Sequence, residues 1–167
     1  EVDALEAGFA WTSNIKQFVV PFSMESIIEE FTQQAPLVEK GEWKEKLPME
    51  TIVNKKFREI GEQKCFLVRH PETYTFFENY KDLGIQDVRF YAGFPDHSFD
   101  VVTALIGDGE SLKNGHAVYV DENLGQIALP DLTKIMQKLH RPPEGYTEKE
   151  NLWVVITGSK NGENKEV

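Results

Sequence analysis

The sequence contains a single cysteine, Cys65, and this scarcity excludes an intrachain disulfide. One thiol and four scattered histidines provide no ligand spacing typical of a structural zinc site. We therefore expect neither a bound metal nor a cofactor. Cys65 lies in the apolar run Lys-Cys-Phe-Leu-Val, which predicts a buried, slowly reacting thiol. A nucleophilic thiol is the alternative, and it would need a base such as His70 nearby in space.

Long hydrophobic runs are also missing. No apolar stretch approaches the roughly 18 residues that a membrane-spanning helix needs, and no segment has the pattern of a signal peptide. The chain starts at Glu1 rather than at Met. Either a leader was removed, or the chain was trimmed, or its first residues are missing. The sequence leaves open an intracellular location and one reached after leader removal.

Basic residues are few compared with acidic ones. The chain has 18 Lys and Arg against 28 Asp and Glu, a net charge of −10. Residues 1–50 contain 10 acidic and 4 basic residues, and residues 91–130 contain 6 and 1. Nucleic acids and anionic membranes are therefore unfavourable partners, because both are bound through Lys and Arg. A DNA mimic would reverse this reasoning, but the acidic residues show no regular, phosphate-like spacing.

Bulky apolar residues are abundant. Of 167 residues, 40% are hydrophobic, including 11 Phe, 5 Tyr and 3 Trp, which is too many for a disordered chain. A chain of this length can bury a substantial core in one domain. We expect a single domain over residues 1–157. Residues 158–167 are polar apart from Val167 and are predicted to form a flexible C-terminal tail.

The periodicity of the apolar residues predicts an α+β fold. Seven segments have the character of strands, namely residues 14–20, 64–69, 85–92, 99–106, 117–120, 126–129 and 152–157. Three sets of residues have helical spacing: Met24, Ile27, Ile28 and Phe31; Phe76, Phe77, Tyr80 and Leu83; and Leu132, Ile135, Met136 and Leu139. Ser23 is the expected N-cap of the first helix, and Gly84 follows the second. Residues 36–50 are predicted to be irregular, and residues 51–60 fit a strand or a short helix. The hairpins predicted in the middle favour a mainly antiparallel sheet of six to seven strands, with three helices on one face.

No motif specifies a reaction, so the sequence favours a protein without catalytic activity. Asp96-His97-Ser98 with Asp100 contains the residue types of a catalytic triad, but triad members converge from separate segments. A polar hairpin tip is the simpler interpretation. His70 and Glu72 flank the predicted start of the second helix. Residues 107–111 are rich in glycine but lack the GxxxxGK[ST] pattern of a phosphate loop, so nucleotide binding is not expected there.

The charge suggests a function as a non-catalytic acidic protein-binding domain, of the inhibitor, toxin-neutralising or assembly-subunit type. Its partner would be a protein with a basic surface. Phe94 lies between Gly93 and Pro95, where an exposed turn aromatic could anchor a partner or fold back over the sheet. The predicted partner-binding residues are Glu25, Glu29, Glu30, Phe94, Asp96, His97, Asp100, Asp108 and Glu110. The alternative is a small-molecule-binding domain or small enzyme with a site near His70, His97 and Asp100. A deep pocket lined by these polar residues would favour the alternative, and a flat acidic face would favour protein binding.

Overall fold

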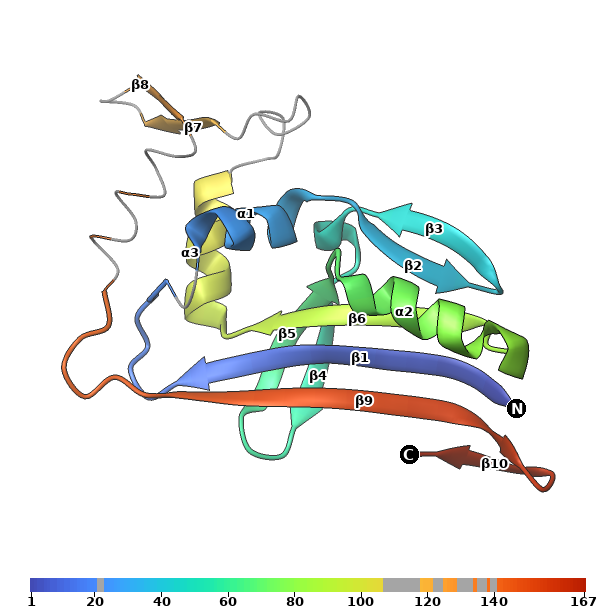
Figure 1. Ribbon diagram of the computed structural model, residues 1–167. Coiled ribbons are helices and arrows are strands. Elements are labelled where there is room, and N and C mark those ends of the chain that lie inside the picture. The colour runs from blue at the N-terminus through green and yellow to red at the C-terminus, as the bar shows by residue number, and fades with distance from the viewer. Residues whose placement is uncertain (21–22, 107–117, 122–124, 129–133, 135–137, 139–140) are drawn as a thin grey trace.

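The computed structural model describes residues 1–20, 23–106, 118–121, 125–128, 134, 138 and 141–167. One long strand, β1 (Val2–Ser13), lies at the centre of the fold (Figure 1). It pairs in parallel with β6 (Asp87–Phe94) and antiparallel with β9 (Glu148–Lys160). Leu5, Ala7 and Trp11 lie on the same face of β1 and are buried in the main core.

The sheet has eight strands and is mixed. Its main order is β10 (Glu163–Glu166), β9, β1, β6, β2 (Ala35–Glu39) and β3 (Glu42–Lys46). β5 (Gly61–Leu67) pairs with both β6 and β4 (Val53–Phe57). The fold is therefore α/β with three α-helices among the described residues, and the predicted mainly antiparallel sheet is corrected by the parallel β1–β6 pair. A parallel pair needs a long connection, and here the chain from Asn14 to Gln86 provides it.

Helix α1 (Met24–Thr32) forms where the sequence predicts it. The hydroxyl of Ser23 caps it by accepting a hydrogen bond from the backbone N–H of Ser26, at 3.4 Å. The predicted apolar stripe is confirmed, because Met24, Ile27, Ile28 and Phe31 are all buried. The helix ends a few residues before Pro36, and Gln33 closes it with a backbone hydrogen bond to Glu29.

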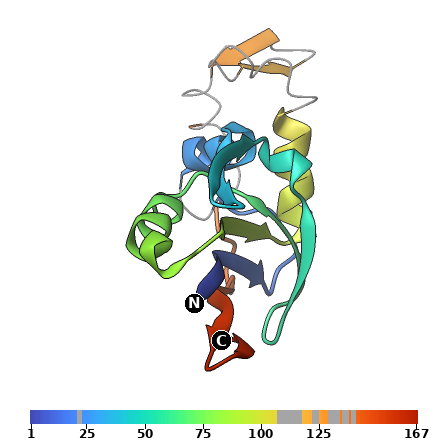
Figure 2. The ribbon, with the colours of Figure 1, turned by 90° about the vertical axis from the view of Figure 1, so that its right-hand side faces the viewer.

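Helix α2 (Pro71–Tyr80) starts at a proline and continues into a short 3-10 turn, η2 (Lys81–Leu83). Gly84 follows with φ of +97°, the left-handed conformation predicted for it. Figure 2 shows α2 on one side of the sheet, with the β4–β5 hairpin on the other side. Phe76, Phe77 and Tyr80 pack against the main core, to which α1 and α3 (Asp96–Ile106) also contribute.

Two predicted strands are wrong. Residues 14–20 form an irregular loop, in which Phe18 and Val19 are nevertheless buried. Residues 99–106 belong to helix α3, where Phe99 and Val102 face the core three positions apart. The β-branched Val101 and Val102 favour a strand locally, but packing against the core stabilises a helix here instead.

The remaining predictions have mixed outcomes. Residues 36–50 contain β2, β3 and the 3-10 turn η1 (Pro48–Glu50) instead of irregular chain, since β3 is a charged edge strand without an apolar pattern. The predicted hairpin exists as β7 (Val118–Asp121) and β8 (Gly125–Ala128). The apolar stripe of the third predicted helix, Leu132, Ile135, Met136 and Leu139, lies outside the described residues. Residues 158–167 form the end of β9 and the exposed strand β10, whereas the sequence predicts a tail.

No helix among the described residues is long and apolar enough to cross a membrane.

Candidate functional site

The carboxyl ends of the two parallel strands bring Ser13 and His97 together. Ala10 of β1 lies opposite Gly93 of β6, so both chains leave the sheet at the same edge. Ser13 ends β1, and His97 lies in the first turn of α3, directly after β6. The Ser13 Oγ and His97 Nε2 atoms are 3.4 Å apart. In open α/β sheets, this edge is the usual location of a ligand site.

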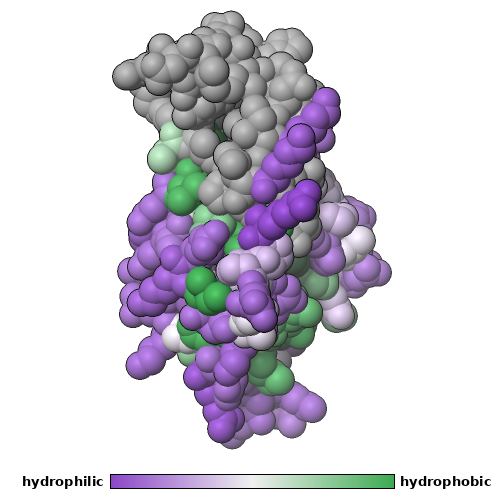
Figure 3. All heavy atoms as spheres, turned by 90° about the vertical axis from the view of Figure 1, so that its left-hand side faces the viewer, coloured by the Kyte–Doolittle hydropathy of each residue, from purple (hydrophilic) through white to green (hydrophobic). Residues whose placement is uncertain are grey.

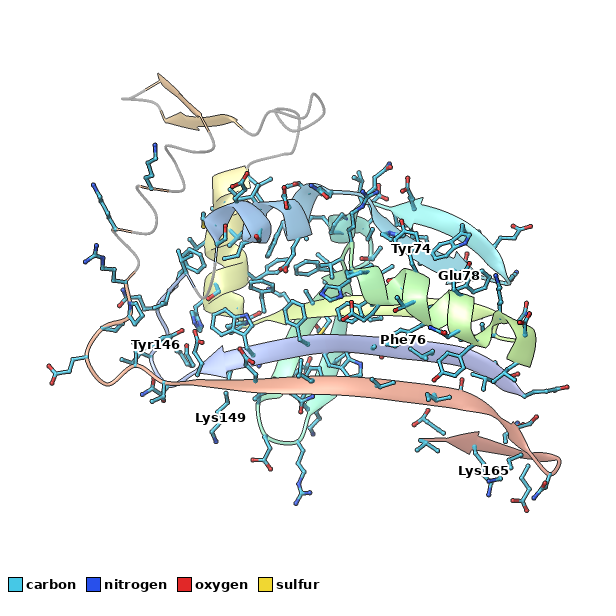
Figure 4. All side chains as sticks on the ribbon, in the orientation of Figure 1. Tyr74, Phe76, Glu78, Tyr146, Lys149 and Lys165 are labelled. Carbon is cyan, nitrogen blue, oxygen red and sulfur yellow. The ribbon has the colours of Figure 1, made fainter. Side chains whose placement is uncertain are left out.

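The segment that leads into β9 and the first residue of β9 add two further polar side chains at this edge. Ser13 and Glu148 are direct partners in the antiparallel β1–β9 register. The hydroxyl of Tyr146 donates a hydrogen bond of 2.5 Å to Glu148 Oε1. Ser13, His97, Tyr146 and Glu148 together form the strand-end cluster, and Tyr146 is labelled in Figure 4.

Asn14 holds the two segments of this cluster in place. Its amide nitrogen donates to the Gly145 carbonyl at 2.9 Å, and its Oδ1 accepts from the Thr147 N–H at 2.9 Å. Its own backbone N–H donates to the Thr147 carbonyl at 3.1 Å. Three hydrogen bonds thus connect the end of β1 to the turn that carries Tyr146.

The hydrogen bonds of Ser13 connect the members of the cluster. The Ser13 Oγ lies 2.8 Å from the Ile15 carbonyl, to which the hydroxyl can donate. The direction of the longer contact with His97 depends on the tautomer of the ring, because a neutral imidazole has one donor nitrogen and one acceptor nitrogen. In either tautomer, neutral His97 has one unprotonated, basic nitrogen.

Burial shifts the pKa values of the two ring-bearing residues in the cluster. It lowers the pKa of His97, and the positive charge of Lys16 lowers it further, against the opposing effect of Asp96. His97 is therefore neutral at pH 7. Burial also raises the pKa of Tyr146, with contributions from its hydrogen bond to Glu148 and from the charge of that carboxylate, while Ser13 opposes the rise. Tyr146 consequently stays protonated and acts as a hydrogen-bond donor.

Aromatic and polar groups lie beneath the cluster. The Trp11 and His97 rings are perpendicular, with centroids 6.4 Å apart. Trp11 Nε1 and Ser98 Oγ are buried and have no hydrogen-bond partner among the described residues. Figure 3 shows this end of the molecule, where a largely hydrophilic surface surrounds small hydrophobic patches.

The structure does not bring His70, His97 and Asp100 into one site. Asp100 and Asp96 both pair with Lys64 of β5, at 3.6 and 3.0 Å. The His70 ring stacks on Phe90 with centroids 4.0 Å apart, and its Nδ1 contacts the Glu72 carboxylate. Of the three predicted site residues, His97 is the one that belongs to the strand-end cluster.

Phe94 is not an exposed turn residue, so its predicted role as a partner anchor is wrong. It is the last residue of β6, and none of its side chain is accessible to solvent. Its ring packs against Trp11, Phe31 and Phe66. The strand continues through Gly93 to Phe94 because β5 pairs with it there, a contact that the local sequence does not reveal.

The predicted acidic residues of α1 differ from one another. Glu25 and Glu29 are exposed, whereas Glu30 is partly buried and burial raises its pKa to about 7. Ser26, Glu29, Glu30, Gln33 and Arg69 line a cavity of about 270 Å³. Asp108 and Glu110 lie outside the described residues.

A larger groove of about 560 Å³ lies between the β2–β3 hairpin and α2, lined by Pro36, Trp43, Lys44, Glu45, Tyr74 and Glu78. The rings of Trp43 and Tyr74 stack there at 4.8 Å, and Figure 4 shows Tyr74 and Glu78 beside the hairpin. Neither this groove nor the Glu30 cavity contains His70, His97 or Asp100.

The prediction that Cys65 is buried is confirmed. The side chain has no accessible surface, and burial raises the thiol pKa to about 12. Within the described part of the chain, no group of three or more His, Cys, Asp or Glu could hold a metal ion.

Three of the four residues of the strand-end cluster could not be identified from the sequence. Ser13 and Glu148 are separated by most of the chain, and neither belongs to a recognisable motif. His97 was identifiable because it lies in a run of polar residue types.

No family model and no curated protein sequence matches the chain. Solved structures do match. One is the apo form of histidine-tagged saccharopine dehydrogenase (L-Glu forming) from Saccharomyces cerevisiae, with a TM-score of 0.71 and 12% sequence identity. The match covers 99% of this chain and 52% of that chain, so this chain spans about half the length of the matched protein.

The likeness concerns the fold alone, but it corrects the expected function. The chain has the fold of part of a dehydrogenase, which overturns the expectation of a non-catalytic acidic domain that binds a basic partner.

Proposed function

We propose that this chain is the substrate-binding part of a small-molecule enzyme of the dehydrogenase type, with the strand-end cluster as its acid–base site. The observation that carries the proposal is the contact of His97 with Ser13 at the carboxyl ends of β1 and β6. The likeness in fold to part of a saccharopine dehydrogenase supports the reaction class. The lowered pKa of His97, which leaves its ring neutral, supports the role of this side chain.

The cluster can accept a proton from a bound substrate. Oxidation of an alcohol or amine passes a hydride from carbon to a hydride acceptor, which would be bound outside this chain, and releases a proton from oxygen or nitrogen. Neutral His97 can take this proton at its unprotonated ring nitrogen, while the contact with Ser13 keeps the ring oriented. Tyr146 remains protonated and presents a hydroxyl beside Ser13. The acquired positive charge would lie near the carboxylate of Asp96.

The residues at this edge do not fit a dinucleotide. Sheets that bind one use a glycine-rich turn after the first strand and the N-terminus of the next helix to hold the pyrophosphate. The connection from β1 to α1, residues 14–23, contains no glycine. The first turn of α3 carries Asp96, whose carboxylate would repel a phosphate. We therefore assign the chain to the substrate side of the enzyme.

NMR titration of the intact chain tests this proposal. The probes are small 2-hydroxy acids, with NADH as a separate arm. We expect at least one acid to shift the ring signals of His97 and the signals of Tyr146, and we expect His97→Gln to weaken its binding at least tenfold. His70→Gln, at a histidine outside the cluster, should leave the affinity unchanged.

Three results would overturn the proposal. Binding that shifts residues elsewhere and spares His97 would place the site in another part of the fold. Tight NADH binding that shifts the strand-end cluster would assign this edge to the nucleotide. An absence of binding by every acid would remove the substrate-binding role.

A further inference from the structure

The polar face of α1 forms one wall of a small cavity. Ser26, Glu29, Glu30 and Gln33 follow one another at helical spacing, on the side of α1 away from its buried stripe. Arg69, from the connection between β5 and α2, lines the cavity with them. None of these residues belongs to the strand-end cluster, so a ligand bound in this cavity would be independent of the proposed function.

Glu30 has one buried carboxyl oxygen without a partner in the described part of the chain. This atom, Oε2, is inaccessible to solvent, and no hydrogen-bond donor among the described residues reaches it. Buried carboxyl oxygens are normally paired, because an unpaired one loses its interactions with water without replacement. Burial is also the cause that raises the pKa of Glu30 to about 7. This side chain would be stabilised by a donor, and above all by a cationic one.

Arg69 has unused donors at the same cavity. Its single described ion pair is with Glu45 of β3, at 3.4 Å, and its side chain is half exposed. A guanidinium has five N–H groups and binds a carboxylate through two of them. No ion pair within 4.0 Å joins Arg69 to Glu30 or Glu29 among the described residues. The cavity therefore presents separate acidic and basic groups to the same space.

We propose that this cavity binds a small dipolar ligand, an amino acid whose ammonium group contacts Glu30 and whose carboxylate contacts Arg69. Ser26 and Gln33 supply neutral hydrogen-bonding groups on the same wall. The volume of about 270 Å³ suits a small metabolite, since drug-sized ligands occupy about 300–1,000 Å³.

Other ligand classes fit the lining less well. Apolar ligands would leave the charged groups unpaired. A phosphate or dicarboxylate would be repelled by Glu29 and by ionised Glu30. A simple cation or anion would use one of the two charged walls and leave the other without a partner.

Titration of the intact chain with glycine, methylammonium and acetate, followed by ¹H–¹⁵N NMR, separates these classes. We expect glycine to bind at least tenfold more tightly than either single-charge probe. Glu30→Gln and Arg69→Gln should each weaken glycine binding at least tenfold. Glu25→Gln, at an exposed acid on the same helix outside the cavity, should have no effect.

Two further measurements test the geometry without disturbing the cavity walls. Glu45→Gln should tighten glycine binding, because it frees Arg69 from its present partner. Glycine should bind more tightly at pH 8 than at pH 5, because Glu30 must be ionised to pair with the ammonium group. The charged groups that line the cavity with it are Glu29 on the same helix and Arg69.

The outcomes are distinct. If acetate bound as tightly as glycine, the cavity would be an anion site at Arg69. If methylammonium bound as tightly as glycine, it would be a cation site. Either result would overturn the proposal. Binding that is unaffected by Glu30→Gln and Arg69→Gln would also overturn it. His97→Gln should leave glycine binding here unchanged, so that a failure of the proposed function remains distinguishable.

Discussion

Burial shifts two ionisable side chains in opposite directions, and both shifts favour the neutral form. The pKa of Glu30 rises to about 7, and the pKa of His97 falls below its ordinary 6.5. Burial in a poorly polar environment disfavours the charged form of both groups, the carboxylate of Glu30 and the imidazolium of His97. These are the two side chains on which the proposed sites depend, and each shift has a measurable consequence for stability.

Glu30 is expected to make the protein less stable as the pH rises from about 4.5 to about 7. In that range the unfolded chain releases the proton and the folded chain retains it, so ionisation favours unfolding. Glu30→Gln should remove this slope and stabilise the protein at pH 8, by at most on the order of 3 kcal/mol. Urea unfolding at pH 5 and pH 8 measures the difference. Glu25→Gln serves as the exposed control, and an equal gain in both variants would contradict the prediction.

His97 is expected to make the protein more stable as the pH rises toward 6.5. Between the lowered folded pKa and 6.5, the unfolded chain binds a proton that the folded chain does not bind. Lys16→Gln should raise the pKa of His97, and Asp96→Asn should lower it. Histidine NMR titration measures both changes. Identical titration curves in the two variants would show that these charges do not act on the ring.

Cys65 is expected to react slowly with thiol reagents in the folded protein. Its side chain is inaccessible, and the thiolate that reacts is scarce at a pKa of about 12. Labelling with a disulfide reagent should require unfolding and should accelerate in urea. Native-state labelling at the rate of free cysteine would contradict the prediction and would make the nucleophile hypothesis more plausible.

At the scale of elements, close packing around β1 depends on glycine. A Cβ atom on Gly8 would lie 2.3 Å from the Tyr91 carbonyl and 2.7 Å from the Trp153 ring. One on Gly93 would lie 2.6 Å from the Cβ of Ala10. The parallel β1–β6 pair, which defines the edge with the strand-end cluster, therefore requires the absence of side chains at both positions.

Gly8→Ala should cost several kcal/mol, beyond the roughly 1–3 kcal/mol typical of overpacking, because the clash includes backbone. Gly61→Ala is the comparison. An added Cβ there meets nothing within 4 Å, but φ is +78°, so only backbone strain of about 1–2 kcal/mol is expected. Urea unfolding of both variants tests the order, and a smaller loss for Gly8→Ala would mean that β1 shifts easily.

Helix α1 is held by its apolar stripe. Ile28→Ala should cost about 2–5 kcal/mol, because the removed methyl groups leave a cavity in the main core. Glu25→Ala on the exposed face should change stability by no more than about 0.5 kcal/mol. Urea unfolding measures both, and a loss below about 1 kcal/mol for Ile28→Ala would show that the stripe does not pack as described.

At the scale of the whole molecule, the two ends of the chain build the centre of the sheet. β1 pairs with β9 along its length, from Val2 opposite Gly158 to Ser13 opposite Glu148. The strand-end cluster takes residues from the start, middle and end of the chain. Its geometry therefore exists only in the complete fold. We expect deletions at the two ends of the chain to differ in their effect on the cluster.

Deletion of residues 161–167 should leave the fold and the strand-end cluster intact. The side chains of β10 are exposed, so the loss should stay below about 1 kcal/mol, a few degrees in Tm. Deletion of residues 1–13 should abolish cooperative unfolding, because β1 contributes to the main core and pairs with two strands. Circular dichroism and thermal melts distinguish the two, and similar melting of both truncated chains would contradict the central role of β1.

Local chemistry determined several features that the sequence alone predicts. The spacing of Met24, Ile27, Ile28 and Phe31 specifies one face of a helix, and Ser23 caps that helix. Gly84 takes the left-handed conformation that ends a helix, and Cys65 is buried in its apolar run. Each of these depends on residues within about one or two helical turns, which is the range over which backbone geometry acts directly.

Only the tertiary structure decided the rest. Residues 99–106 favour a strand by themselves and form α3 because Phe99 and Val102 find the core there. Phe94 is buried because β5 extends β6 beyond the expected turn, and His97 meets Ser13 because β1 and β6 run in parallel. These outcomes depend on strand pairings across tens of residues. Such pairings are stabilised by packing between distant segments, for which the local pattern of apolar residues holds no signal.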